Sequence, residues 1–443
     1  MTYILIIYFA IILFVGFKTK GYKNRKDYIY AGRKLTAIPL LMTLVTTWYG
    51  AISGIGQEIS YNGIATWLYL GLAYYIAAFI YSEFISDKII EYNISSILSG
   101  ILKYMGKTSA IIATPIVLLY ISPAPYLIML GNIIDTTIFE SKEFGISVLI
   151  GLILSTLYCF KGGFKSIINT DRYQFYFMFS GFLLLVIYII FFYDYGFREL
   201  SSIYSKNPEL FSITGKQGWG YIIAWGFLAM LTFIDPSFHQ RTFASKNKEE
   251  IKKAIRLSII FWFAFDMMTL FCGLYAINLP SNTPYVSLAE TVFQNSPILY
   301  GIFIISILSI LMSTIDSFTF ISAITIGKDL RKIFKKDYNQ NHINWGIFIS
   351  IIISILIILL FDNSRVMNIW FTFGSYMVSG LLIPFLCIIS DRKIKKPVIF
   401  ILAPVLLTFI WDSMSLGYTL LPSMYPGLLL SVILGLFLTK KLR

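Results

Sequence analysis

Charged residues are scarce in this sequence. Asp, Glu, Lys and Arg make up 13% of its 443 residues, and 57% of the residues are hydrophobic. A soluble domain usually carries about 25% charged residues. Together with a mean hydropathy of +0.74, this shortage excludes an ordinary soluble protein and predicts a polytopic membrane protein.

Residues that ligate metals or perform covalent catalysis are also few. The chain has three cysteines and two histidines. All three cysteines (Cys159, Cys272 and Cys387) fall inside apolar segments, with no metal-binding spacing and no disulfide framework. No glycine-rich phosphate loop, zinc motif or catalytic triad is recognisable. We therefore expect neither an enzyme nor a protein with a bound cofactor.

The apolar segments are long and numerous enough for about thirteen transmembrane helices. We place them at about 2–17, 37–61, 64–84, 109–133, 145–161, 173–193, 218–240, 254–278, 298–327, 343–361, 366–390, 397–411 and 421–439. The longest outer loop is 194–217, and no soluble domain of useful size is evident. We expect one transmembrane domain over 1–443, so any work it does depends on an ion or solute gradient.

The distribution of basic residues orients these helices. With the N-terminus outside, the inner loops and the C-terminal tail hold 31 of the 36 Lys and Arg residues, and the outer loops hold 5. Such a bias is typical of cytoplasmic loops. It predicts a multi-pass protein of the cell membrane with a cytoplasmic C-terminus. It also explains the net charge of +13 without a nucleic-acid partner.

Two predicted helices contain residues that favour a break. The second predicted span (37–61) has three glycines within seven residues. The seventh predicted span (218–240) has two glycines followed by Asp-Pro. These residues are Gly50, Gly54, Gly56, Gly220, Gly226, Asp235 and Pro236. Broken helices in corresponding places of two halves indicate a transporter site near the membrane midplane. The alternative is that the glycines only allow close helix packing.

The spacing of the two candidate breaks suggests an internal repeat. Helices 2–6 (37–193) and 7–11 (218–390) form two five-helix sets of opposite orientation. They are flanked by an extra N-terminal helix (1–17) and by C-terminal helices (397–439). The predicted fold class is therefore an all-α membrane protein with two inverted five-helix repeats and flanking helices.

The ninth predicted helix carries a polar stripe. At 3.6 residues per turn, its serines stack on one side, with a carboxylate beside them. The residues are Ser306, Ser309, Ser313, Ser317 and Asp316. Polar atoms in hydrocarbon are costly, and an intramembrane Asp usually lines an ion or solute path. A row of hydroxyls suits Na⁺, although serines also bond to carbonyls of their own helix.

Five stretches resemble those of one known family, in the right order and on the right helices. They are DYIYAGRKL (27–35), TWYGAISGIGQEISYNG (47–63), GGFKS with TD and Gln174 (162–174), DP with QR and ASK (235–246), and LMSTIDS with KDL (311–330). In these stretches the chain resembles the sodium:solute symporter family, which has the leucine-transporter-type fold.

The resemblance implies a sodium site between helices 2 and 9. Its ligands would be the backbone carbonyls of Leu44, Thr47 and Ile310 and the hydroxyls of Ser313 and Thr314. Oxygen ligands without a carboxylate suit a weakly bound monovalent cation rather than Ca²⁺ or Mg²⁺.

Some family members carry a second cation site, and here it would include two acids. Asp171 would join Ser313, Asp316 and Ser317, and a second Na⁺ or a proton would bridge the two carboxylates. The alternative for Asp171 is a pairing with the neighbouring bases Arg172 or Lys165.

The resemblance also implies a solute pocket between the two breaks. Its candidate residues are Trp48, Tyr49, Ala51, Gln57 and Asp235, with Glu58 near the outer mouth. Sugar-transporting relatives carry amide side chains at the positions of Ala51 and Asp235, so a sugar site of that pattern is not expected. Asp235 meets an amine or hydroxyl, caps a helix, or pairs with Arg241. Trp48 and Tyr49 line the pocket or only pack.

The function implied by the resemblance is inward Na⁺ movement coupled to uptake of a small organic solute by alternating access. The expected partners are Na⁺, the solute and the lipid bilayer. Proton-coupled or uncoupled transport on the same fold, and a transporter-like solute sensor, stay open as alternatives.

Overall fold

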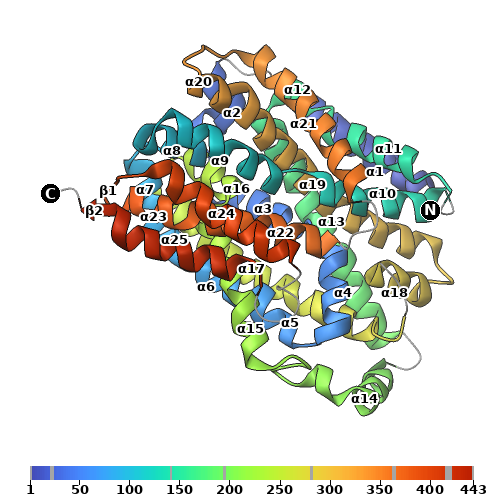
Figure 1. The fold of residues 1–443 in the computed structure, drawn as a ribbon. Helices are drawn as coiled ribbons and strands as arrows, with labels where there is room; N and C mark the ends of the chain where they lie inside the picture. Colours follow the sequence, from blue (N-terminus) through green and yellow to red (C-terminus); the bar gives the residue numbers. More distant parts are fainter. Residues whose placement is uncertain are drawn as a thin grey trace.

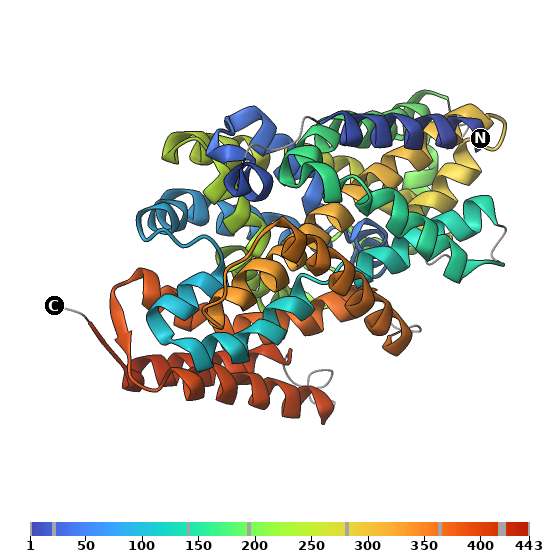
Figure 2. The same ribbon diagram turned by 90° about the horizontal axis from the view of Figure 1, so that it is seen from above.

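The chain forms an elongated bundle of helices (Figures 1 and 2). The structure is a computed structural model that describes residues 2–19, 24–139, 142–192, 196–279, 283–361, 366–414 and 422–441. In both views, the start of α1 and the end of β2 lie at opposite ends of the bundle. Termini at opposite ends accord with an odd number of crossings.

The first half of the chain is helical apart from short connections. Its elements are α1 (Thr2–Lys18), α2 (Arg25–Tyr30), η1 (Ala31–Arg33), α3 (Ala37–Trp48), α4 (Ile52–Asn62), α5 (Ala65–Trp67), η2 (Leu68–Leu72), α6 (Ala73–Ile80), η3 (Tyr81–Ile85), α7 (Ser86–Glu91), α8 (Ile97–Met105), α9 (Lys107–Tyr120), α10 (Ala124–Ile138), α11 (Phe144–Thr156), α12 (Cys159–Gly162), α13 (Phe164–Phe191), α14 (Gly196–Lys206) and η4 (Pro208–Phe211).

The second half follows the same pattern and ends with a small pair of strands. Its elements are α15 (Gly218–Gly226), η5 (Phe227–Phe233), α16 (Pro236–Ala244), α17 (Lys248–Tyr275), α18 (Pro284–Val292), α19 (Pro297–Ile324), η6 (Thr325–Leu330), α20 (Arg331–Ile333), α21 (Gln340–Leu360), α22 (Val366–Met377), η7 (Val378–Leu382), α23 (Ile383–Ile389), β1 (Arg392–Ile394), α24 (Pro397–Ser413), α25 (Met424–Leu438) and β2 (Thr439–Lys441). β1 and β2 pair antiparallel.

The helices are long and apolar enough to cross a membrane. Within the described residues, nine helices pass this test, and α3 with α4 pass it together as one bent pair. Three further apolar helices are shorter, namely α1, α24 and α25. These segments match the predicted spans in order and approximate position, so the all-α membrane-spanning class is confirmed. The boundaries of the repeats stay a prediction.

The second predicted span opens where its first glycine lies. α3 ends at Trp48, α4 begins at Ile52, and the two are bent by 58°. A Cβ atom at Gly50 would lie 2.4 Å from Thr314 Cγ2 and 2.8 Å from Thr314 Oγ1. Only glycine therefore lets the break approach α19 this closely. Gly54, in contrast, lies inside α4 and makes room for Met367.

The seventh predicted span breaks at Asp-Pro rather than at its glycines. The chain tightens into a 3₁₀ segment over Phe227–Phe233 and restarts as α16 at Pro236. Asp235 stands at the N-cap and accepts hydrogen bonds from the backbone N–H groups of Ser237 (2.7 Å) and Phe238 (3.2 Å). Gly220 lies in regular helix, and a Cβ there would meet nothing within 4 Å.

The two broken spans are joined at one end. The backbone N–H of Leu35 donates to the Ala244 carbonyl (3.3 Å), and the N–H of Lys246 donates to the Leu35 carbonyl (2.9 Å). Glu250 Oε2 accepts from the N–H of Ala37, 2.5 Å away. The beginning of α3 is thus fastened to the end of α16 and to the beginning of α17. α3 also packs against α13 and α19 in the middle of the bundle (Figure 1).

The tight approach at Gly50 makes a direct prediction. We expect Gly50→Ala to lower the melting temperature in detergent, because overpacking costs about 1–3 kcal/mol. Gly220→Ala is the matched control and should keep or slightly raise the melting temperature, because alanine favours the helix. Equal melting temperatures for Gly50→Ala and the wild type would contradict a close contact between the break and α19.

Candidate cation and solute site

The predicted sodium ligands of the broken helix and of α19 face each other. The Thr314 hydroxyl lies within hydrogen-bond distance of two carbonyl oxygens, those of Ile310 (3.0 Å) and Thr47 (3.2 Å). Ser313 Oγ lies 3.4 Å from Thr47 Oγ1. Four of the five predicted ligand residues therefore meet at one place. Leu44, the fifth, is buried one turn before Thr47 on α3 and lines the adjoining cavity.

Two buried carboxylates lie behind these hydroxyls. Asp171 Oδ1 accepts a hydrogen bond from the Ser313 hydroxyl (2.6 Å), and Asp316 Oδ2 accepts one from the Tyr158 hydroxyl (2.6 Å). Both Asp side chains are fully buried, and the second oxygen of each has no hydrogen-bond partner among the described residues. Asp171 points toward α19. Within the described part of the chain, no ion pair joins it to Arg172 or Lys165.

A buried arginine occupies the other side of the same cluster. Arg241 Nη2 donates to the hydroxyls of Thr47 (2.7 Å), Thr43 (2.8 Å) and Ser317 (3.0 Å). Sequence analysis counted Arg241 among the inner loops, but its side chain is 0% exposed. The signal available in the sequence was its place six residues after Asp235, inside the helix that follows the break.

The serine stripe of α19 divides into two parts. Ser306 donates to the Phe303 carbonyl of its own helix (2.7 Å), as the alternative interpretation expected. Ser309 donates to the Tyr8 hydroxyl of α1 (2.9 Å). Only Ser313 and Ser317 reach the polar cluster around Thr47.

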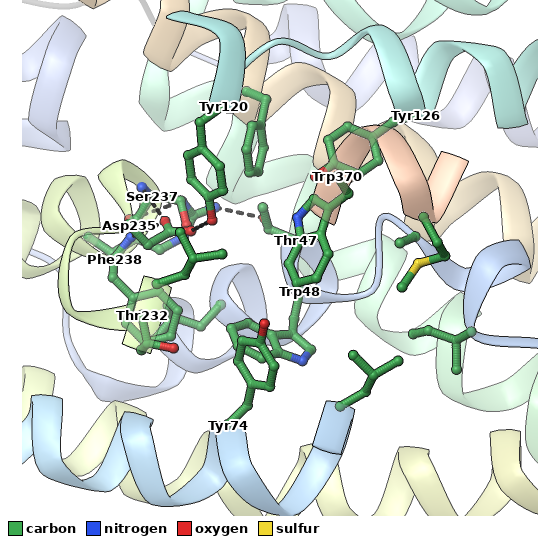
Figure 3. A pocket seen from close by; sticks show the side chains of 18 residues that line it. Thr47, Trp48, Tyr74, Tyr120, Tyr126, Thr232, Asp235, Ser237, Phe238 and Trp370 are labelled. Carbon is green, nitrogen blue, oxygen red and sulfur yellow. Dashed lines mark hydrogen bonds between the residues drawn. The ribbon is translucent and has the colours of Figure 1, made fainter. Parts of the chain in front are cut away.

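A cavity adjoins this cluster. It is lined by Leu44, Thr47, Trp48, Ala51, Ile55, Leu70, Tyr74, Tyr120, Tyr126, Leu231, Thr232, Asp235, Ser237, Phe238, Arg241, Phe318, Met367 and Trp370. The two breaks both contribute to its wall, as expected for a solute pocket between them. Figure 3 shows Tyr120 and Asp235 meeting on one side, with Trp48, Tyr74 and Trp370 across from them.

Asp235 is held firmly at the cavity wall. Besides the two backbone N–H donors that make it a helix cap, its Oδ2 accepts from the Tyr120 hydroxyl (2.7 Å). The capping interpretation is therefore confirmed. Among the described residues, no ion pair within 4.0 Å joins Asp235 to Arg241.

Two hydroxyls of the cavity lack partners. Tyr74 and Thr232 are 3% and 1% exposed, and neither hydroxyl has a hydrogen-bond partner in the described residues. Buried polar groups are normally paired, so an unpaired one calls for an explanation such as a ligand. Both residues line the cavity, which makes them binding candidates that sequence analysis missed.

Two predicted solute residues do not line this cavity. The hydroxyl of Tyr49 points away from it, to Asp266 Oδ1 on α17 (2.7 Å). Gln57 lies in α4, outside the cavity lining. Glu58 accepts hydrogen bonds from Tyr69 (2.7 Å) and Asn62 (3.1 Å), also away from the cavity. Sequence analysis overlooked Asp266, although an acid inside an apolar span was a visible signal.

The buried cluster predicts a strong dependence on Arg241. We expect Arg241→Gln to destabilise the protein by roughly 3–5 kcal/mol, because Asp171 and Asp316 lose their nearby positive charge. Adding Asp171→Asn should recover part of this loss, since the two residues share one cluster. Melting temperatures of the single and double variants measure the coupling.

Arg256→Gln is the matched control for this cycle. Arg256 pairs with Glu83 at the surface, with its own side chain 54% exposed. Such pairs contribute about 0–1 kcal/mol, so the control should change little. Additive effects of Arg241→Gln and Asp171→Asn would mean that the guanidinium and the carboxylate do not interact.

Comparison with known proteins agrees with this geometry. The sodium:solute symporter family matches residues 28–390. Sodium-coupled monocarboxylate transporter 1 of Homo sapiens is 23% identical over 370 residues, which cover 77% of this chain and 59% of that protein. The sodium/proline symporter of Salmonella typhimurium is 24% identical over 410 residues, which cover 83% of this chain and 79% of that protein. The chain thus spans about three fifths of the human relative.

Solved structures share the fold. A substrate-bound, outward-open Na⁺-coupled sialic acid symporter matches with a TM-score of 0.82 at 15% identity, covering 100% of this chain and 98% of that one. A manganese transporter of Eremococcus coleocola matches with a TM-score of 0.57 at 14% identity, covering 94% of this chain and 93% of that one. With the family matched over most of its length, this chain belongs to the sodium:solute symporter family.

Proposed function

We propose that this protein couples the inward movement of Na⁺ to the uptake of a small organic solute by alternating access. The observation that carries the proposal is the meeting of Thr47 with Ser313 and Thr314 beside the cavity. The opened end of α3 offers backbone carbonyls, and α19 offers hydroxyls. This is a neutral oxygen set that suits a monovalent cation.

Thr47 gives the coupling a physical route. Its carbonyl accepts from Thr314 (3.2 Å), its hydroxyl accepts from Arg241 (2.7 Å), and it lines the cavity next to Trp48. A cation bound at the Thr47 carbonyl therefore fixes the end of α3 that forms the cavity wall. Each Na⁺ that moves inward gains about 2.3 kcal/mol per 100 mV, which supports roughly fifty-fold accumulation.

The distribution of basic residues supports a location in a cell membrane. We propose that the loops rich in Lys and Arg lie in the cytoplasm, with the N-terminus outside and the C-terminus inside. The start of α1 and the end of β2 lie at opposite ends of the bundle (Figure 2), which supports placing the two termini on opposite sides of the membrane.

We further propose that the solute carries an ammonium group. Asp235 is an acidic side chain on the cavity wall, and it accepts hydrogen bonds from two backbone N–H groups and from Tyr120. Aromatic faces attract cations within about 6 Å. The rings of Trp48 and Tyr74 lie 5.1 Å apart, and Trp370 follows at 6.3 Å from Tyr74.

The charge count around the cavity supports two added cations. Asp171, Asp235 and Asp316 are three carboxyl groups, and Arg241 is the one basic residue in contact with the cluster or the cavity among the residues described. With all three acids ionised, the region carries a net charge of −2. One Na⁺ and one ammonium group neutralise it. A monocarboxylate alone would add a further negative charge beside Asp235.

Sodium binding is tested by thermal stability. A ligand that binds only the folded state raises the melting temperature by mass action. NaCl should therefore stabilise the purified protein more than KCl or choline chloride at equal ionic strength. Ser313→Ala and Thr314→Val should lose this Na⁺-specific rise, because each removes a ligand hydroxyl.

Ser306→Ala is the control on the same helix. Ser306 bonds only to its own helix carbonyl, so its removal should leave the sodium effect intact. An undiminished Na⁺-specific rise in both Ser313→Ala and Thr314→Val would sink the site assignment.

The solute class is tested by a screen in NaCl. Proline, a quaternary ammonium zwitterion, a monocarboxylate and a sugar are compared by melting temperature and by uptake of the labelled compound into proteoliposomes. We expect the ammonium compounds to bind, and we expect Asp235→Asn to weaken their binding at least ten-fold. Asn keeps the helix cap but removes the charge.

Asp412→Asn is the charge-matched control for this screen, because Asp412 lies on α24 and outside the cavity lining. Binding of the monocarboxylate or the sugar alone would overturn the ammonium proposal and leave sodium coupling standing.

A further inference from the structure

A further intramembrane carboxyl group lies on α17, in contact with the break that follows α3. Asp266 is in the middle of α17, in the apolar run FWFAFDMMTLF. Its Oδ1 is 2.7 Å from the hydroxyl of Tyr49, which follows the last residue of α3 at the break. Its Oδ2 bonds to the hydroxyl of Tyr75 on α6. One side chain thus joins three elements.

The hydrogen bonds around Asp266 need more protons than the two tyrosines supply. The Tyr49 oxygen is within bonding distance of both Asp266 Oδ1 (2.7 Å) and the Trp262 carbonyl (2.9 Å). The Tyr75 oxygen makes the third contact, with Oδ2. Each oxygen–oxygen hydrogen bond contains one proton. Three bonds therefore need three protons, and two phenols provide only two.

A proton on Asp266 completes the set. The carboxyl Oδ1–H then donates to the Tyr49 oxygen, and the Tyr49 hydroxyl donates to the Trp262 carbonyl. Tyr75 donates to Oδ2. Without that proton, the Tyr49 hydroxyl serves either the carboxylate or the carbonyl, and the other contact loses its hydrogen bond.

Among the described residues, no basic side chain lies close enough to balance an ionised Asp266. The small cavity beside it is lined by Trp48, Tyr49, Ile55, Ile59, Thr66, Trp67, Leu70, Gly71, Asp266, Thr269 and Leu270, a set without Lys, Arg or His. An unbalanced carboxylate inside a bilayer is costly.

Among the described residues, the titratable groups that the packed elements present to Asp266 are phenols. Tyr49 comes from the break, Tyr75 from α6 and Tyr285 from α18. α13 contributes the apolar rings of Phe179 and Phe182 against Phe265. Gly71 lets the carboxyl approach, since a Cβ there would lie 2.8 Å from Oδ2.

We propose that Asp266 is a proton-binding site that controls the break between α3 and α4. In the conformation described, the carboxyl group holds a proton and ties Tyr49 to α17. Loss of that proton to water leaves a carboxylate that draws the Tyr49 hydroxyl from the Trp262 carbonyl. Because Tyr49 follows Trp48 directly, this change reaches the wall of the solute cavity.

The proton site goes beyond the proposed sodium and solute sites, which use other residues. The structure therefore predicts an influence of pH that does not require Asp171 or Asp316. The site exists in the purified protein without a gradient or a solute, so it can be tested separately from transport.

Infrared spectroscopy of the purified protein tests for the proton directly. A protonated carboxyl group has its own C=O band, which shifts on exchange into D₂O. At neutral pH, we expect the carboxyl C=O band of Asp266→Asn to be smaller than that of the wild type by the area of one carboxyl group. Tyr49→Phe should move the Asp266 band, since its bonding partner at the break is removed.

Uptake at varied pH tests the control of the break. At constant Na⁺, the uptake rate of the wild type should change between weakly acidic and alkaline pH, and Asp266→Asn should flatten this dependence. Asp412→Asn is the matched control and should keep it. An unchanged carboxyl band in Asp266→Asn, or a pH profile identical to that of the wild type, overturns the proposal. Neither result bears on sodium binding at Ser313 and Thr314.

Discussion

A helix that opens inside a membrane must find new partners for its backbone, because lipid offers none. In this protein the opening after Trp48 is possible because α19 lies directly against it. The absence of a side chain at Gly50 permits that approach, and Thr314 places a hydroxyl near the Thr47 carbonyl. The cation cluster and the cavity wall both depend on this contact between a broken helix and an intact one.

Charge sets the second constraint. Arg241 is fully buried, and its guanidinium is surrounded by hydroxyls rather than by a directly bonded carboxylate. Its charge acts on Asp171 and Asp316 from a short distance without closing an ion pair. The hydroxyl groups between them stay available to a small cation.

Three of the intramembrane acids illustrate how different the hydrogen bonding of one residue type can be. Asp235 receives three donors. Asp266 contacts two phenol groups, and the three hydrogen bonds around it need one proton more than these phenols supply. Asp171 has one oxygen bonded to Ser313 and one free of partners in the described structure. Residues of one type therefore stand in three different hydrogen-bonding environments within one bundle.

Much of the fold was predictable, because apolar length and the positions of basic residues constrain membrane helices strongly. The placement of the first break was also predictable, since three glycines in seven residues weaken a helix. The second break was found, but its cause was assigned to glycines as well as to Asp-Pro. Gly220 turned out to lie in regular helix, because an isolated glycine lowers helix stability without ending the helix.

The directions of the side chains at the break could not be predicted from the sequence. Tyr49 and Trp48 are neighbours, yet one reaches Asp266 and the other lines the cavity. Helical periodicity cannot assign faces to residues where the helix ends. Arg241 was counted in the inner loop because the predicted span ended at residue 240, although its long side chain reaches hydroxyls inside the bundle. Asp266 was overlooked because it has no polar neighbours in sequence, and its partners come from other helices.

The backbone bridge between Leu35 and the end of α16 has a mechanical consequence. Because α3 and α16 are fastened at this end, and Glu250 adds the start of α17, the three ends cannot separate independently. Any reorientation of the broken spans must turn them about this common pivot. The largest displacement then falls at the far ends of α3 and α16, where Trp48 and Asp235 lie. A small rotation at the pivot is amplified over the length of each half-helix into the geometry of the cavity.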